Sequence, residues 1–395
     1  MSAARAGEAL TYCLNIHPAE TWEEMRAALT GPVLRVRDGF APDGPFPVGL
    51  RISARALDDL KKPEARAELA ELLRAEQLRA VTVNGFPYGQ FHGTRVKEEV
   101  YRPDWREIER LRYTVDLAEL MADIAPPGET VSLSTVPGCF RALADGAQDG
   151  IADHYLQAAA YLFGLEQKSG VRVALAIEPE PACLLETIAE TCAFFRERLY
   201  SPSARLRFAK LTGLSPDEAR DVLPRHLGLC YDVCHAAVEF EDPAESLALL
   251  RDAGVPVHKL QLSAALRVPE VSPETRQALG KFDEPTYLHQ VVARRNGALS
   301  RYTDLRPALS RGAEADGEEW RVHFHVPIFL KDLGAFESTR DFLAQILALH
   351  RAEPISNHLE VETYTWDVLP EELRRQSVDE AILRELRWVN EQLGG

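Results

Sequence analysis

The chain has 395 residues, of which 46% are hydrophobic and 27% are charged, and its formal net charge is −16. This composition supports a large core, and the charge excludes the basic face that non-specific binding to nucleic acids or anionic lipids requires. The six cysteines include no C-x-x-C pair and do not make a disulfide framework in so long a chain. We therefore expect reduced thiols and a cytoplasmic protein, because MSAARAGEALTYCLNIHP does not resemble a signal peptide and no run of about 18 apolar residues exists to cross a membrane.

Short apolar runs rich in β-branched residues alternate with helical patterns along the chain. The runs predict strands at 10–18, 48–54, 80–89, 130–140, 171–181, 227–235, 257–266, 320–329 and 358–367. Ala and Leu at three- and four-residue spacing predict helices at 63–78, 151–170, 242–254, 338–351 and 377–393. The runs show little internal alternation, which is typical of strands buried on both faces. Repeated strand–helix alternation predicts a parallel sheet.

Several helix ends carry recognisable capping residues. Ser377 precedes Glu380 by three residues, which is the spacing of a capping box, and Ser338 precedes another helical run. Gly170 and Gly254 stand where a C-cap glycine would end a helix just before a strand.

The distribution of polar residues favours a closed barrel over an open doubly wound sheet. An open sheet of the Rossmann type has a Gly-rich turn after its first strand, whereas the first run here ends in NIHP. Acidic and imidazole residues follow several different runs, as they would on the face of a barrel where all strand ends converge. We predict a single (β/α)₈ TIM barrel over 1–395, with an insertion at 267–319 after the seventh strand that forms a lid or a side subdomain. The run 320–329 is then an extra strand or the returning half of the seventh unit.

The motif CYDVCH closes one apolar run with a carboxylate and an imidazole. Asp232 and His235 have D-x-x-H spacing, so both side chains can face one cavity where the strand turns into a loop. Carboxylate and imidazole together suit a divalent metal. The alternative is a helix-capping Asp beside a surface His.

Two further runs end in glutamates. Glu178 directly follows VALAI, and Glu180 comes two residues later as a weaker candidate. In HLEVETYTWD, Glu360 and Glu362 share a strand face; Glu362 is the preferred ligand, and Glu360 is expected one layer deeper. Two carboxylates stacked in this way require a metal or a shared proton. The alternatives are an ordinary polar loop for the first pair and a solvated edge strand for the second.

The fourth ligand of such a metal is not decided by spacing. His323 and His325 share a strand face in VHFHVP, and Gln261 in KLQLS competes for the same position. One of the histidines would then bind substrate instead. His17, Asn84, Tyr88 and His92 follow the first and third runs and are expected to line a substrate pocket, unless they only accompany turns.

Absent motifs narrow the chemistry. The sequence has no G-x-x-x-x-G-K-[ST] loop, no G-x-S-x-G elbow and no H-E-x-x-H helix. ATP-driven, serine-esterase and zincin activities therefore lose support.

The order of these residues resembles the xylose-isomerase-like TIM barrels, which include sugar epimerases, hydroxypyruvate isomerase and inosose dehydratase. The resemblance implies that Glu178, Asp232, Glu362 and Gln261, or a histidine in place of Gln261, bind the metal. It also implies that His235 contacts substrate. More narrowly, TYCLNIHPAETW, AIEPEPACLLET, CYDVCH and LEVETYTW look like the EboE family, metabolite-traffic proteins of bacterial ebo gene clusters.

The candidate ligands and this resemblance together predict a metal-dependent isomerase or epimerase; that its hydroxycarbonyl substrates are sugar-like is implied by the resemblance alone. A divalent ion (Mn, Zn, Co or Mg) would stabilise an enediolate, Glu178 and Glu362 would exchange the proton, and His235 would orient a substrate oxygen. The alternatives are a non-catalytic metabolite-binding protein for export and a metal-dependent hydrolase on a related barrel. We expect a small-molecule substrate and neither nucleic acid nor membrane as a partner; the oligomeric state, including a homo-oligomer, stays open.

Overall fold

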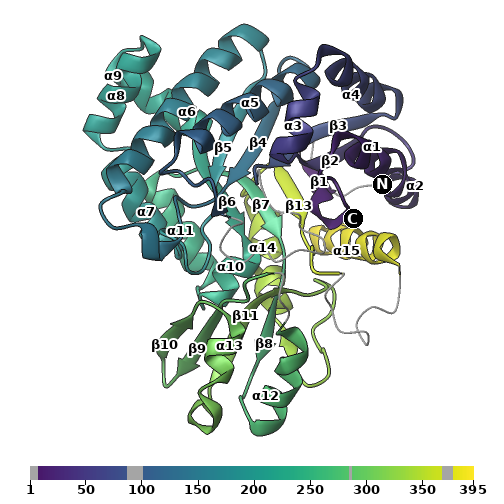
Figure 1. The fold of residues 1–395 in the computed structure, drawn as a ribbon, viewed down its shortest axis with the longest axis vertical. Helices are drawn as coiled ribbons and strands as arrows, with labels where there is room; N and C mark the ends of the chain where they lie inside the picture. Colours follow the sequence, from purple (N-terminus) through teal and green to yellow (C-terminus); the bar gives the residue numbers. More distant parts are fainter. Residues whose placement is uncertain (1–7, 87–100, 284–286, 367–376) are drawn as a thin grey trace.

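The computed structural model describes residues 8–86, 101–283, 287–366 and 377–395. Eight parallel strands form one sheet in the order β1-β13-β7-β6-β5-β4-β3-β2. A parallel bridge between Cys13 and Gly49 links the two edge strands, so the sheet closes into a barrel (Figure 1). The predicted (β/α)₈ barrel is therefore confirmed. Its strands are β1 (Ala9–Tyr12), β2 (Phe46–Arg51), β3 (Leu78–Asn84), β4 (Thr130–Thr135), β5 (Arg172–Ile177), β6 (Leu227–Asp232), β7 (Val257–Leu262) and β13 (His358–Val361).

Helices connect successive strands and cover the outside of the barrel (Figure 1). None in the described ranges is long and apolar enough to cross a membrane. The helices are α1 (Trp22–Thr30), α2 (Pro32–Phe40), α3 (Ala54–Leu60), α4 (Pro63–Ala75), α5 (Ile108–Ile124), α6 (Gln148–Ser169), α7 (Ile188–Phe194), α8 (Pro202–Thr212), α9 (Pro216–His226), α10 (Val233–Val238), α11 (Pro243–Ala253), α14 (Arg340–Ala352) and α15 (Val378–Leu393).

The predicted helix ends are confirmed with one exception. Gly170 and Gly254 end α6 and α11 in the left-handed conformation, at φ of 73° and 67°, which a glycine adopts without steric cost. Ser377 forms the expected capping box. The prediction for Ser338 is wrong: this residue ends a short strand, and Thr339 precedes α14 without a side-chain cap.

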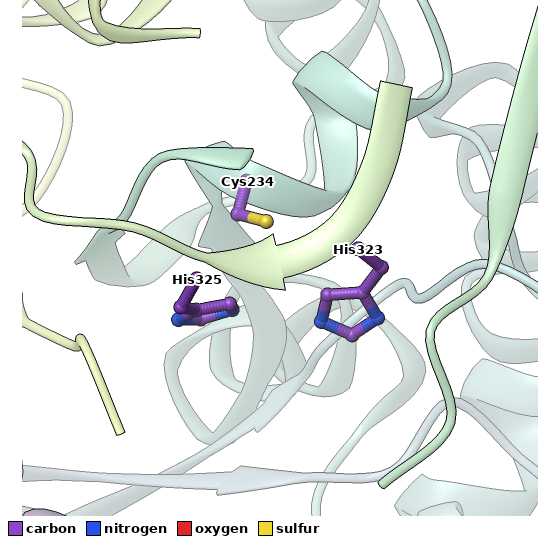
Figure 2. A group of neighbouring side chains, drawn as sticks. All are labelled: Cys234, His323 and His325. Carbon is purple, nitrogen blue, oxygen red and sulfur yellow. The ribbon is translucent and has the colours of Figure 1, made fainter. Parts of the chain in front are cut away.

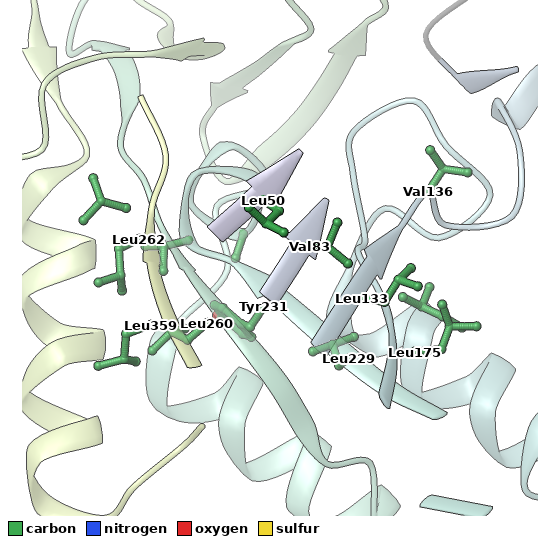
Figure 3. Packing of buried hydrophobic residues seen from close by; sticks show 14 of the residues in the cluster. Leu50, Val83, Leu133, Val136, Leu175, Leu229, Tyr231, Leu260, Leu262 and Leu359 are labelled. Atoms are coloured by element: carbon green, nitrogen blue, oxygen red, sulfur yellow. The ribbon is translucent and has the colours of Figure 1, made fainter. Parts of the chain in front are cut away.

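The barrel strands alternate between two sets of side chains. One set is apolar and packs under the helices, as Figure 3 shows for Leu50, Leu133 and Leu229. The other set faces the barrel axis, because side chains alternate along a strand. That inner set is small or polar and includes Thr82, Asn84, Ser132, Ser134, Ala174, Ala176, Cys230, Lys259 and Gln261. The interior can therefore hold a polar site beneath the strand ends.

A second, antiparallel sheet lies beside the barrel, at the lower end of the view in Figure 1, and its strands come between β7 and α14 in the sequence. Its strand order is β10-β9-β11-β8-β12, so the predicted run 320–329 forms an extra strand. The sheet begins before residue 267 and ends after residue 319, because β8 pairs with β11 and β12. The strands of this sheet are β8 (Ala265–Val268), β9 (Val291–Arg295), β10 (Ala298–Tyr302), β11 (Glu319–His325) and β12 (Glu337–Ser338), and the same part of the chain contains the helices α12 (Pro273–Leu279) and α13 (Leu305–Leu309).

Candidate metal centre

Three carboxylates that the sequence selects meet at the carboxyl end of the barrel. Glu178 follows β5, Asp232 ends β6 and Glu362 follows β13. Carboxylate oxygens of the three lie within 4.8 Å of one another, and all three residues are buried. They meet because parallel barrel strands deliver their end residues to one face. We refer to this trio as the carboxylate site.

The carboxylate site concentrates negative charge away from water. Burial, reinforced by Asp232, raises the pKa of Glu178 to about 7. Burial and the two neighbouring carboxylates raise the pKa of Glu362 well above its ordinary value. Within the described part of the chain, no lysine or arginine forms an ion pair with any of the three. Unpaired buried charge is costly, and a divalent cation would offset that cost.

Two oxygens of the carboxylate site have no hydrogen-bond partner within the described ranges of the chain. Asp232 Oδ1 accepts from Ser263 Oγ at 2.8 Å and from the His235 backbone N–H at 3.0 Å, whereas Asp232 Oδ2 has no partner. Glu178 Oε2 is also buried without a partner. Because buried polar atoms are normally hydrogen-bonded, these free oxygens fit a bound cation.

Gln261 is the fourth-ligand candidate that contacts the carboxylates most directly. Its Nε2 donates to Glu178 Oε1 at 3.1 Å and to Glu362 Oε2. Its Oε1 accepts from Cys230 Sγ at 3.4 Å. The amide thus turns its nitrogen toward the carboxylates, and its oxygen would face a cation only after the amide rotates by half a turn. With its nitrogen placed in this way, Gln261 bridges Glu178 and Glu362.

His235 stands at the edge of the carboxylate site. Its Nδ1 donates to the Pro179 carbonyl at 2.8 Å, so Nε2 is turned toward the carboxylate site, 3.9 Å from Asp232 Oδ2. Burial lowers the pKa of His235, but the carboxylates of Asp232, Glu180 and Glu178 raise it by more, to about 9. This imidazole therefore compensates part of the carboxylate charge.

His323 and His325 come from β11, the central strand of the second sheet (Figure 2). His323 Nδ1 donates to Gln290 Oε1 at 2.7 Å, and His325 Nδ1 donates to the Glu362 carbonyl at 2.6 Å. Burial lowers the pKa of His325 to about 4 and that of His323 well below its ordinary value. The structure places both rings beside His235 rather than within the carboxylate site, so the second sheet contributes side chains to the barrel mouth.

A polar layer lies beneath the carboxylate site. Glu360 forms a buried ion pair with Lys259 and accepts a hydrogen bond from Asn84 Nδ2 at 3.0 Å. Lys259 thus supplies a positive charge beside Glu360 that the sequence analysis did not anticipate, and the expected balance of Glu360 and Glu362 by a metal or a shared proton stays a prediction. Asn84 Oδ1 accepts from Lys259 Nζ and from Ser134 Oγ. Its predicted contact with substrate stays a prediction.

Sequence reasoning missed Lys259, although a signal was present. Lys259 precedes Gln261 by two residues in VHKLQL, so both face the barrel axis. It also missed Asn15, whose Nδ2 donates to Glu362 Oε1 at 2.7 Å. Asn15 lies in NIHP, directly after the first strand. Among the predicted pocket residues, His17 contacts Tyr12 Oη at 3.1 Å; Tyr88 and His92 lie outside the described residues.

No protein-family model matches this chain, and no curated protein matches it. Similar solved structures include an IOLI protein with a bound zinc atom, at 13% identity and a TM-score of 0.47, over 98% of this chain and 97% of that one. A xylose isomerase domain protein from Planctomyces limnophilus has 10% identity and a TM-score of 0.46, over 91% and 90%. The 3-keto-D-glucoside 4-epimerase YcjR from E. coli has 12% identity and a TM-score of 0.43, over 97% and 98%. Because these TM-scores lie below 0.5, the chemistry of the centre rests on its own geometry.

That geometry provides for two chemical tasks. The three carboxylates and the Gln261 amide form an oxygen-rich cradle of the kind that divalent cations prefer. Glu178 and His235 also present atoms that can hold or accept a proton in a site closed to water, where electrostatic interactions are strong.

Proposed function

We propose that this chain is a metal-dependent isomerase or epimerase that acts on small, sugar-like hydroxycarbonyl compounds. The observation that carries the proposal is the carboxylate site: three buried carboxylates from three separate strand ends, within 4.8 Å of one another. The order of these residues along the chain, which resembles xylose-isomerase-like barrels, supports the same reaction class.

Glu178, Asp232, Gln261 and Glu362 would hold the cation. When bound, a divalent ion supplies positive charge that stabilises the negative charge of an enediolate. Glu178 would take a proton from a substrate carbon with the carboxylate oxygen that does not face the cation. Glu362 Oε1 is held by Asn15, so this carboxylate has a fixed orientation from which to return the proton to the neighbouring carbon.

The imidazoles would orient the substrate. His235 is fixed through Nδ1 and turns Nε2 toward the carboxylate site, where it can hold a substrate oxygen. We extend the same role to His323 and His325, which lie beside His235, and to His17. The resemblance of four motifs to EboE further supports a place in a secondary-metabolite pathway of the ebo type.

Hydrogen exchange into substrate tests the proposal. Metal-loaded protein is incubated in D₂O with a panel of ketohexoses and keto-inositols, and deuterium incorporation next to the carbonyl is followed by NMR. Wild type is expected to exchange at least one compound, and Glu178→Gln and Glu362→Gln to slow that exchange about 100-fold or more, the range of a lost general acid or base. Equal exchange by wild type and both variants would overturn the assigned roles, and binding without any exchange would instead support a metabolite-binding protein.

A metal-dependent hydrolase is the second candidate, because three imidazoles lie beside the carboxylates. Hydrolytic metal centres on related barrels use several histidine ligands, and the net charge of −16 opposes a nucleic-acid substrate. Release of nitrophenol from a phosphodiester by the metal-loaded wild type, and its loss in His325→Gln, would favour this activity over isomerisation.

A further inference from the structure

A second group of metal-binding side chains adjoins the carboxylate site. Asp232, His235 and His325 offer ligand atoms within 4.8 Å of one another, and all three residues are buried. We refer to these three residues as the imidazole site. Asp232 belongs to both sites, whereas His325 comes from the second sheet, which inserts β11 at the mouth of the barrel.

The hydrogen bonds of the imidazoles fix which ring nitrogen carries the hydrogen when the ring is neutral. His235 and His325 each direct Nδ1 at a backbone carbonyl, of Pro179 and Glu362 respectively. A carbonyl oxygen only accepts, so each Nδ1 carries a hydrogen and each neutral ring keeps a lone pair on Nε2. Orientation by an Nδ1–H donated to an oxygen is the arrangement that supports metal-binding histidines.

His323 also carries a ring hydrogen on Nδ1. Its Nδ1 contacts Gln290 Oε1 at 2.7 Å, and the Gln290 Nε2 donates to the Pro181 carbonyl at 3.1 Å, which fixes the direction of that amide. The Nε2 atoms of His235 and His323 then face each other at 3.2 Å. Two lone pairs at this separation repel unless a proton or a cation lies beside them.

Two atoms of the imidazole site are otherwise unsatisfied. His325 Nε2 and Asp232 Oδ2 are buried and have no hydrogen-bond partner among the residues that the structure describes. Asp232 Oδ2 lies 3.9 Å from His235 Nε2, so both atoms can bind one cation after only a small movement. A proton between His235 and His323 would relieve one contact and leave both of these atoms unpaired.

We propose that this centre binds two divalent cations, one in the carboxylate site and a second held by Asp232, His235 and His325. Two imidazoles and one carboxylate suit first-row ions such as Zn²⁺, Co²⁺, Ni²⁺ or Fe²⁺. The part of the inference that concerns the first ion rests on the proposed function. The second ion gives β11 a chemical role, because the insertion then completes the centre. In this arrangement His235 binds the second ion instead of contacting substrate directly.

Cys234 is the nearest rival ligand, since its Sγ lies within 4.8 Å of ligand atoms of His323 and His325 (Figure 2). Cys234 also packs in a small apolar cluster with Val238, Ala265 and Val292. We therefore assign Cys234 to packing, and Cys234→Ser serves as the matched control.

Metal stoichiometry tests the inference. Full-length protein is stripped with a chelator, reloaded with Zn²⁺ alone, desalted and analysed for zinc per chain, with folding checked by circular dichroism. The expected values are two ions for wild type and Cys234→Ser, and one for His325→Gln and for Glu178→Gln. His235→Gln tests the same site should His325→Gln not fold.

The outcomes separate the two sites. One ion in wild type that persists in His325→Gln and is lost in Glu178→Gln would overturn the second site and leave the proposed function standing. One ion lost only in His325→Gln would support the imidazole site and contradict the carboxylate site. Loss of an ion in Cys234→Ser would overturn the ligand assignment, and zinc-free wild type would overturn both sites.

Discussion

Replacement of Lys259 by methionine tests the polar layer under the centre. Lys259 and Glu360 form an ion pair in which both side chains are fully buried. Removal of one partner of such a pair costs about 3–5 kcal/mol, because the other charge stays buried and uncompensated. Asn84 still donates to Glu360 at 3.0 Å, so we expect about 3 kcal/mol. With an unfolding entropy of about 2.1 cal/mol/K per residue, a chain of this length would lose about 4 °C in Tm.

Thermal and urea unfolding of the apoprotein measure this loss. The matched control is the double variant Lys259→Met/Glu360→Gln, which removes both charges and keeps an acceptor for Asn84. It should recover most of the lost stability, because a buried pair replaced by neutral groups is often close to neutral. If Lys259→Met unfolds within about 1 °C of wild type, or if the double variant is no more stable than the single one, the ion pair does not stabilise the barrel interior as argued.

Three other predictions concern the fold and the centre. Gly49→Ala should lower the free energy of unfolding in urea by about 1–3 kcal/mol or more, because the new Cβ would lie 1.7 Å from Glu360 Oε1. The control Gly150→Ala in α6, where no atom lies within 4 Å of the new Cβ, should be neutral or stabilising. Equal effects of the two substitutions would contradict the close approach at Gly49. Burial raises the pKa of Glu385 from 4.5 to about 8, so the contribution of its protonated form to folding stability is full below pH 4.5 and is lost as the pH rises through 8. The free energy of unfolding of Glu385→Gln should therefore match that of wild type at pH 5 and exceed it at pH 9. Parallel pH profiles of stability for the two proteins would refute this. Finally, chelation should lower the Tm, and a divalent ion at 100 times its Kd should restore about 2.7 kcal/mol; an unchanged Tm would speak against a bound metal.

The barrel could be predicted because its signal is local. Apolar runs that form barrel strands alternate with helical patterns along the chain, and the carboxyl end of every such strand lies on one face. Glu178, Asp232 and Glu362 therefore meet wherever the strands close into a barrel, without further information. The strands are shorter than the predicted runs because loop residues follow them directly, as Glu178 and Pro179 do after β5.

The rest depends on contacts between distant segments. His323 and His325 reach the centre only because β11 pairs with β8 and β9, and H-x-H spacing does not encode that pairing. Lys259 and Glu360 are separated by about a hundred residues and each reads alone as an ordinary charged residue. Their ion pair follows from strand register, which places β13 beside β7 with Glu360 opposite Gln261.

An anomalous diffraction map of crystals grown with Mn²⁺ tests the central claim most directly. The account predicts an anomalous peak bounded by Glu178, Asp232 and Glu362, with the Gln261 amide turned so that its oxygen faces the ion. Full Mn²⁺ occupancy elsewhere in the molecule, with the three carboxylates bound only to water or to one another, would contradict it.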